Sequence, residues 1–124
     1  MENIKHFIID FDSTFTKVEA LDILAEIALE GNPKKESIIN RVKEVTDLGM
    51  SGELSFRDSL EERISIIKAH KDHLPPLVSS LKNKISNSFK RNKEFIKKNA
   101  HQFYILSNGF KEFIIPVVAE YGIE

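Results

Sequence analysis

The stretch Ile-Lys-His-Phe-Ile-Ile-Asp-Phe-Asp-Ser-Thr, residues 4–14, decides how the rest of the chain is interpreted. Its apolar part, Ile4–Ile9, is short and ends in three consecutive apolar residues, which is typical of a strand buried on both faces in a parallel sheet. Two aspartates, Asp10 and Asp12, follow this run directly. Ligand sites in open α/β sheets lie outside the carboxyl ends of the strands. The stretch therefore predicts an α/β fold with a polar site at the end of its first strand.

The two carboxylates stand two residues apart, and bringing them together costs free energy through mutual repulsion and loss of solvent. A divalent cation would offset that cost, and magnesium prefers hard oxygen ligands of this kind. One aspartate could act as a nucleophile while the other donates a proton to a leaving oxygen and then activates water. The structural alternative is that Asp10 and Asp12 cap a turn and that Ser13 or Thr14 caps the next helix.

A second apolar run, Phe103–Leu106, predicts another buried strand, and a polar turn follows it. That turn, Ser107-Asn108-Gly109, offers a hydroxyl and free backbone N–H groups before the last helix. Such an arrangement can hold a phosphate group. Turns rich in Ser, Asn and Gly are common, so this motif carries weight only together with the two aspartates.

The segment of roughly 90 residues between the two strands is too long for a simple crossover and carries helical patterns. It predicts an inserted helical subdomain. Ser55 is a good N-cap, the Gly-Met-Ser-Gly sequence at 49–52 is expected to break a helix, and Pro116 is expected to kink or interrupt the last one. The expected helices are 20–30, a helix after Pro33 that runs to 48, 55–67, a short helix opened by Pro75 and Pro76, 88–98, and 113–121.

Taken together, the two polar motifs resemble those of the haloacid dehalogenase superfamily of phosphatases. Asp-Phe-Asp-Ser-Thr at 10–14 follows one apolar strand, and Leu-Ser-Asn-Gly-Phe at 106–110 follows the other. Within that superfamily the chain resembles the phosphoserine phosphatases, whose first motif is followed by a glutamate at the spacing of Glu19. Their pattern of Met, Gly, Phe, a Ser/Ala-Leu pair and Arg is matched here by Met50, Gly52, Phe56, Ser59-Leu60 and Arg63. The resemblance covers essentially the whole chain.

The resemblance implies an incomplete, Rossmann-like parallel-sheet core of the haloacid dehalogenase type with an inserted α-helical cap. Residues 1–16 and 76–124 would form the partial core, and residues 17–75 would form the cap. The implied reaction is magnesium-dependent hydrolysis of a phosphomonoester through an aspartyl-phosphate. The implied substrate is a small phosphorylated metabolite, with phosphoserine favoured, which would place the protein in serine biosynthesis.

The resemblance also implies a role for each matched residue. Asp10 would be the nucleophile and a magnesium ligand. Asp12 would be the general acid and base, and would bind the metal through its backbone carbonyl. The implied substrate-binding residues are Glu19 and Arg63 for the amino and carboxylate groups, Met50 and Phe56 for the pocket wall, and Ser107, Asn108 and Gly109 for the phosphoryl group.

Some of these positions have a plainer interpretation. Met50 and Phe56 also suit a hydrophobic core, and Arg63 could pair with Glu62 at the surface. The superfamily commonly has Ser-Gly-Gly where this chain has Ser-Asn-Gly at 107–109. Because asparagine tolerates unusual backbone angles, the loop is expected to keep its shape.

The superfamily also uses a later lysine and a Gly-Asp-x-x-x-Asp segment, which this sequence lacks. The chain is therefore expected to correspond to the first two-thirds of such an enzyme. The alternative function is a catalytically incomplete fragment, or a non-catalytic domain that binds a partner. An unfinished parallel sheet would leave a strand edge open, through which two copies of the chain could pair.

The composition excludes several other classes of protein. The 124 residues suit one domain, or one domain with a small appendage. The 18 basic and 19 acidic residues nearly cancel, which argues against a nucleic-acid binder or a polybasic membrane anchor. The absence of cysteine excludes disulfides and thiolate metal sites. No apolar run is long enough for a membrane span and the start is unlike a signal peptide, so a cytoplasmic protein is expected.

Overall fold

The computed structural model describes residues 4–107 and 109–123. The contacts among its residues divide the chain into two units, each with a core of its own. The sheet unit comprises residues 1–23 and 74–124, and the helical unit comprises residues 24–73. None of the helices within the described ranges is long and apolar enough to cross a membrane.

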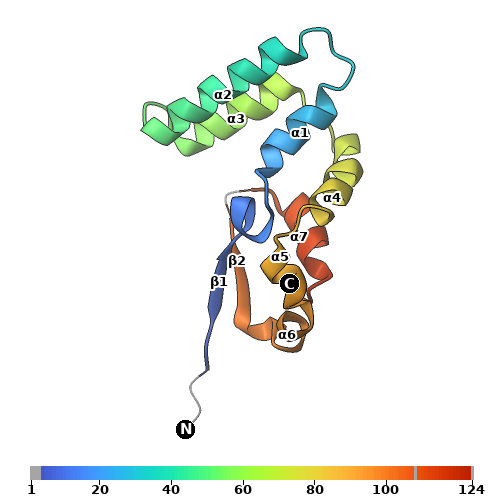
Figure 1. Cartoon of the computed structure of the whole chain (residues 1–124). Coiled ribbons are helices and arrows are strands. Elements are labelled where there is room, and N and C mark those ends of the chain that lie inside the picture. Colours follow the sequence, from blue (N-terminus) through green and yellow to red (C-terminus); the bar gives the residue numbers. More distant parts are fainter. Residues whose placement is uncertain (1–3, 108, 124) are drawn as a thin grey trace. The chain divides into compact units, whose positions relative to one another are not determined.

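The sheet unit contains two parallel strands, β1 (Phe7–Asp10) and β2 (Phe103–Leu106), which lie side by side in Figure 1. They confirm the α/β fold that the two apolar runs predict. Asp10 is in register with Leu106, so both strands end at the same edge of the sheet. The polar residues that follow each strand are thereby brought to that edge.

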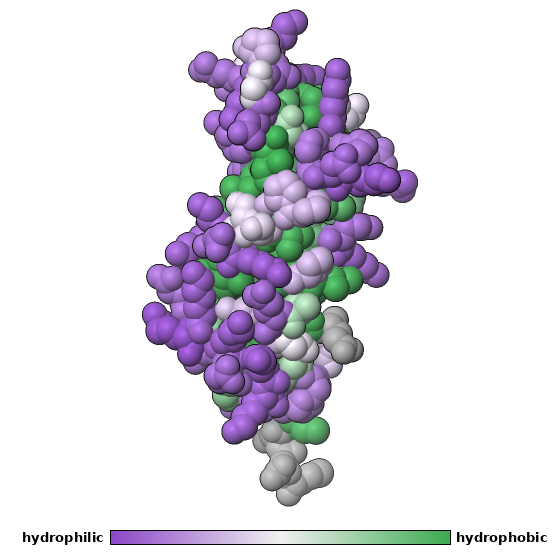
Figure 2. Space-filling model, turned by 90° about the vertical axis from the view of Figure 1, so that its right-hand side faces the viewer, coloured by the Kyte–Doolittle hydropathy of each residue, from purple (hydrophilic) through white to green (hydrophobic). Residues whose placement is uncertain are grey.

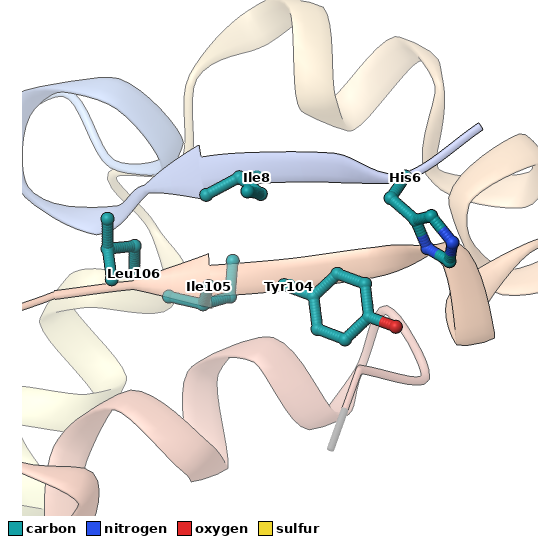
Figure 3. Close-up of a pocket in the computed structure, with 5 residues that line it drawn as sticks. All are labelled: His6, Ile8, Tyr104, Ile105 and Leu106. Carbon is teal, nitrogen blue, oxygen red and sulfur yellow. The ribbon is translucent and has the colours of Figure 1, made fainter.

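One face of this sheet is open within the described part of the chain, which corrects the expectation of strands buried on both faces. Side chains alternate between the two faces of a strand. Ile8, Tyr104 and Leu106 are 70%, 50% and 67% exposed, whereas Ile9 and Phe103 are buried. The open side carries an apolar groove of about 440 Å³ that is lined by side chains from and next to both strands (Figure 3). Both faces are apolar as predicted, but the described elements cover only one of them.

Helices α4 (Leu74–Lys82) and α7 (Lys111–Ala119) pack against each other in the sheet unit. Pro75 and Pro76 stand in the first turn of α4, as predicted, where their missing N–H groups break no helical bond. Pro116 lies inside α7, and the helix continues past it. The buried apolar side chains of this unit are Ile9, Phe11, Phe15, Ala20, Leu77, Leu81, Ile85, Ile96, Phe103, Phe113, Ile114, Val117, Val118, Tyr121 and Ile123.

The segment before β2 forms two short helices, where one helix from Ser88 to Lys98 was expected. These are α5 (Asn87–Arg91) and α6 (Lys93–Lys98). Asn92 separates them, and its side-chain amide donates to the Ser88 carbonyl at 2.7 Å. The asparagine side chain satisfies an acceptor at the helix end and so competes with continuation of the helix. Short helical turns also occur at η1 (Phe11–Phe15) after β1, at η2 (Lys71–His73) in the helical unit and at η3 (Ala100–Gln102) before β2.

In the helical unit, α2 (Lys35–Ser51) and α3 (Phe56–Ile67) lie side by side (Figure 1). Helix α1 (Ala20–Ala28) begins in the sheet unit and continues into this one. The Ser55 hydroxyl accepts the Asp58 N–H at 3.1 Å, which confirms the predicted cap of α3. The buried side chains of the unit are Leu24, Ala25, Leu29, Val42, Val45, Ser59 and Ile67.

Helix α2 ends within the sequence at 49–52, where a break is predicted, although it continues through Gly49. It ends only at Gly52, whose φ of 83° lies in the left-handed region that glycine adopts without strain. A Cβ on Gly49 would lie 2.7 Å from the Ser59 Oγ of α3. Ser59 in turn donates to the Val45 carbonyl of α2 at 2.9 Å. Gly49 is therefore a site where α2 and α3 approach closely.

Both units expose large apolar side chains, and Figure 2 shows green apolar atoms at the surface between purple hydrophilic ones. In the helical unit the most exposed are Met50 and Phe56. The sheet unit exposes more of them. Its exposed residues are Ile4, Phe7, Ile8, Phe95, Tyr104, Leu106, Phe110 and Ile115.

Candidate active site

The chain between β1 and α1 forms a single wide turn, η1 (Phe11–Phe15), that carries the second aspartate. Phe11 and Phe15 at its two ends are fully buried, while the residues between them reach the surface. Ser13 adopts a left-handed backbone with a φ of 58°, which is uncommon for a residue other than glycine. Its N–H donates to the Val18 carbonyl at 3.0 Å. The two buried rings and this bond fix the shape of the turn.

Asp12 is half-buried, and its Oδ1 accepts the N–H of Ala20 at 2.7 Å. Ala20 is the first residue of α1, so the carboxylate of Asp12 caps that helix. The sequence left open that these polar residues only cap a turn and the next helix. Part of that interpretation is confirmed, but the cap of the helix is Asp12 and not Ser13 or Thr14. Capping holds the carboxylate in one orientation and leaves its second oxygen for other partners.

Burial raises the pKa of the Asp12 carboxyl above the ordinary value of an aspartate. The hydrogen bond from Ala20 opposes this rise, and the neighbouring carboxylates of Glu19, Asp10 and Asp22 add to it. Asp12 therefore holds a proton more strongly than an ordinary aspartate does. A carboxyl of that kind suits general acid chemistry.

Asp10 is exposed at the end of β1, and its register with Leu106 places it beside the end of β2. Ser107, which follows Leu106, is partly buried. The structure therefore places these two predicted site residues at the same edge of the sheet, on adjacent strands.

The turn after β2 is built around Gly109. Its N–H donates to the Ser107 Oγ at 2.9 Å, which folds the turn back on itself. A Cβ on Gly109 would lie 3.0 Å from the Phe113 ring and 3.2 Å from the Ser107 Oγ. A larger side chain would push on both, so glycine suits the turn between β2 and α7. Asn108, the third predicted residue of this turn, lies outside the described residues.

Glu19 is exposed and lies just before α1. Its Oε1 accepts a hydrogen bond from the Ser13 hydroxyl at 2.7 Å. Sequence reasoning missed this contact, because it depends on the left-handed backbone of Ser13. It also missed Thr16, which is fully buried and donates to the Val18 carbonyl at 2.7 Å. The spacing of these residues in the sequence does not predict the bond from Ser13 to Glu19 or the bond from Thr16 to Val18.

The other predicted site residues belong to the helical unit. Met50 and Phe56 are 84% and 48% exposed, so neither is a core residue of that unit. The Arg63 Nε donates to the Ser59 carbonyl at 3.3 Å. Glu62 pairs with Arg41 of α2 at 3.3 Å.

The two aspartates supply hard oxygen donors, which magnesium prefers. Their surroundings are negative, because Glu19 and Asp22 lie near Asp12, and a cation would relieve that repulsion. Within residues 4–107 and 109–123, no three His, Asp or Glu side chains gather as they would around a metal ion. The two carboxylates thus fit magnesium in the kind of donor that they offer.

No protein-family model matches the chain. It is 32% identical over 114 residues to a phosphoserine phosphatase of Drosophila melanogaster, which covers 92% of this chain and 39% of the relative. It is 34% identical over 127 residues to a phosphoserine phosphatase of Campylobacter jejuni subsp. doylei, which covers 97% and 54%. A solved phosphoserine phosphohydrolase-like protein from Francisella tularensis superposes with a TM-score of 0.77 at 30% identity, covering 97% of this chain and 55% of that one. The chain spans about half the length of these proteins or less.

The chain shares the fold of that phosphoserine phosphohydrolase-like protein, a fold of the haloacid dehalogenase type, with a partial parallel-sheet core. Within that class the chain is phosphoserine phosphatase-like in both sequence and structure.

Proposed function

We propose that the protein is a magnesium-dependent phosphomonoester hydrolase that acts on phosphoserine. The observation that carries the proposal is the edge of the sheet, where Asp10, Asp12 and Ser107 follow two parallel strands in a chain whose relatives are named phosphoserine phosphatases. Asp12 is half-buried and accepts a hydrogen bond from the start of α1, whereas Asp10 is exposed. This difference supports different roles for the two carboxyls, with Asp10 as the nucleophile and Asp12 as the general acid and base.

In the proposed reaction a carboxylate oxygen of Asp10 attacks phosphorus, and the bond from phosphorus to the ester oxygen breaks. Asp12 gives its proton to that oxygen, which leaves as the hydroxyl of serine. Asp12, now ionised, takes a proton from a water molecule whose oxygen attacks the phosphorus of the aspartyl-phosphate. The bond to Asp10 then breaks, phosphate leaves, and Asp12 carries a proton again. The raised pKa of Asp12 supports both of its steps.

Magnesium would be held by the Asp10 carboxylate and the backbone carbonyl of Asp12. When bound, it would neutralise charge on the phosphoryl oxygens and on the nucleophile. Ser107 and the backbone N–H groups at the start of α7 would receive the phosphoryl oxygens. The hydrogen bond from the Gly109 N–H to the Ser107 Oγ supports this role, because it holds the hydroxyl and the backbone of that turn together.

The serine part of the substrate would be held by Glu19 and Arg63, with Met50 and Phe56 as the pocket wall. Arginine clamps a carboxylate with two parallel hydrogen bonds, which lysine cannot reproduce. Because Glu19 already accepts a bond from Ser13, a substrate amino group would join an oriented carboxylate. A cytoplasmic location and a place in serine biosynthesis belong to the same proposal.

Phosphate release from phosphoserine by the 124-residue chain tests the proposal. We expect release that requires magnesium and that falls to background in Asp10→Asn. Asp47→Asn, an exposed aspartate of α2, is the matched control and should keep full activity. Phosphoethanolamine, which lacks the carboxylate, should be hydrolysed more slowly than phosphoserine. Arg63→Lys should reduce the ratio of the two rates, because Arg63 is the proposed partner of that carboxylate.

Release that persists in Asp10→Asn would contradict the proposed nucleophile. No release above that variant would favour the alternative, a non-catalytic or catalytically incomplete member of this class. Pairing of two copies through the sheet edge stays a prediction. Light scattering tests it, and a monomer at high concentration would contradict it.

A further inference from the structure

The turn that carries Asp12 is held by a segment from far along the chain. The Ser86 hydroxyl donates to the Thr14 carbonyl at 2.6 Å across 72 positions of sequence. The Ser86 N–H donates to the Phe15 carbonyl at 2.9 Å. The Lys17 N–H donates to the Lys84 carbonyl at 2.7 Å. Three hydrogen bonds thus join residues 14–17 to residues 84–86 within the sheet unit.

This junction is anchored in the core. Thr16 and Ile85 form an antiparallel bridge between the two segments, and both side chains are buried. The Phe15 ring lies 5.1 Å from the Phe89 ring of α5 and 5.1 Å from the Tyr121 ring. The buried bridge therefore holds Ile85 beside the turn, and the next residue, Ser86, presents two donors to it.

We propose that Ser86 is a positioning residue for the reaction, which holds η1 in the shape that presents Asp10 and Asp12. The inference rests on the proposed function. Within the turn, the backbone is uncommon at Ser13, and its closing bonds run from Thr16 to Phe11 and from Ser13 to Val18. The Ser86 hydroxyl adds a bond to a carbonyl two residues after Asp12, at the exposed side of the turn where those bonds do not reach.

Loss of this bond would let the turn relax without unfolding the unit, because the hydrophobic contacts of Phe11 and Phe15 remain. Displacements of about 1 Å in a catalytic group lower rates by about two orders of magnitude, so a partial relaxation should be visible in turnover. Ser86 itself is neither the nucleophile nor a proton donor. It acts through the backbone that carries those groups.

The test compares Ser86→Ala with Ser86→Thr, which keeps the hydroxyl, and with Ser88→Ala, an exposed serine two residues further along in α5. Ser86→Pro is a sharper variant, because the native φ of −59° suits proline and both donors are removed. Two readouts are needed. They are the steady-state kinetics of phosphate release from phosphoserine, and hydrogen exchange of the amides of η1, α4 and α7.

We expect Ser86→Ala to lower kcat about tenfold with KM changed by less than about twofold, and to speed exchange at the Ser13 and Thr16 amides about tenfold. Amides of α4 and α7 should keep their protection. Ser86→Pro should lower kcat and speed exchange at the turn by more than Ser86→Ala does. Ser86→Thr and Ser88→Ala should keep the kcat and the exchange rates of the unchanged protein.

Unchanged exchange at the turn in Ser86→Ala would overturn the inference, as would equal acceleration in α4 and α7, which would mark a merely structural role. A loss of turnover through KM alone would also contradict it. If the unchanged chain releases no phosphate, the proposed function fails on its own. The exchange readout still decides whether Ser86 holds the turn.

Discussion

The helical unit and the sheet unit are stabilised by contacts of different range. In the helical unit, α2 and α3 form their backbone hydrogen bonds within themselves and bury a narrow apolar stripe. In the sheet unit, β1 pairs with a strand near the other end of the chain, and Thr14 is held by Ser86. The candidate catalytic residues Asp10 and Asp12 and the candidate phosphoryl-binding residue Ser107 all lie in the sheet unit. Changes far away in the sequence should therefore disturb the site, while changes in α2 and α3 away from Met50, Phe56 and Arg63 should act mainly on the packing of those helices.

The largest expected effect is in the core of the sheet unit. Phe15→Ala removes a fully buried ring that contacts Phe89 and Tyr121, and it should lower the free energy of unfolding by about 3–5 kcal/mol. Urea unfolding measures the change. Phe95→Ala, where the side chain is 54% exposed, should cost about 1 kcal/mol or less. Equal costs for the two variants would remove the evidence that buried aromatic contacts hold the turn.

The next effect tests the helical unit at the closest approach of its two helices. Gly49→Ala should destabilise by about 1–3 kcal/mol, because the new Cβ would lie 2.7 Å from the Ser59 Oγ. Combining it with Ser59→Gly should recover part of the loss. In an ordinary helix the same change stabilises by about 0.5–1 kcal/mol. An increase in the urea midpoint for Gly49→Ala would therefore contradict the close contact.

A smaller effect is expected at the start of α3. Ser55→Ala removes the acceptor for the Asp58 N–H and should cost about 1 kcal/mol. Ser55→Asp keeps an acceptor and should stay close to the unchanged protein. Ser65→Ala, at an exposed position of the same helix, should stay within about 0.5 kcal/mol. If Ser65→Ala lowered the free energy of unfolding as much as Ser55→Ala, the hydrogen bond of the cap would not be the cause of the loss.

The smallest expected effect on stability is electrostatic and concerns Asp12 in the sheet unit. Because the pKa of Asp12 is raised in the folded protein, its contribution to stability is largest at low pH and is lost as pH rises through the folded pKa. Asp12→Asn removes the ionised carboxylate and keeps an oxygen for the Ala20 N–H. The variant should be the more stable protein at about pH 7, and its advantage should shrink at about pH 4. Lower stability of Asp12→Asn at neutral pH would contradict the pKa direction.

The same difference in contact range explains what could be predicted from the sequence. The strand at Phe103–Leu106 and the cap at Ser55 were predictable, because each depends on residues close together in the chain. The close contact at Gly49 could not be predicted, because it depends on Ser59 of another helix. The bond from Ser86 to the turn has no signature in the spacing of residues.

The candidate site shows the same division. The order of a strand, two aspartates and a Ser-Thr pair is local, and it placed Asp10 and Asp12 correctly at the end of β1. The bond from Ser13 to Glu19 depends on a left-handed backbone that a serine rarely adopts, so the pattern could not reveal it. The open face of the sheet was also unforeseen, because an apolar run predicts that a face can be covered and not what covers it.

The most direct test of the central claim is to trap the covalent intermediate. The chain would be mixed with magnesium and phosphoserine carrying a labelled phosphoryl group, quenched in acid within a single turnover, digested and analysed by mass spectrometry. We expect one phosphoryl group on the peptide that contains residues 4–14, attached to Asp10 and absent from Asp10→Asn. Phosphate release without a labelled peptide, or a label on any other residue, would contradict the assignment of Asp10 as the nucleophile.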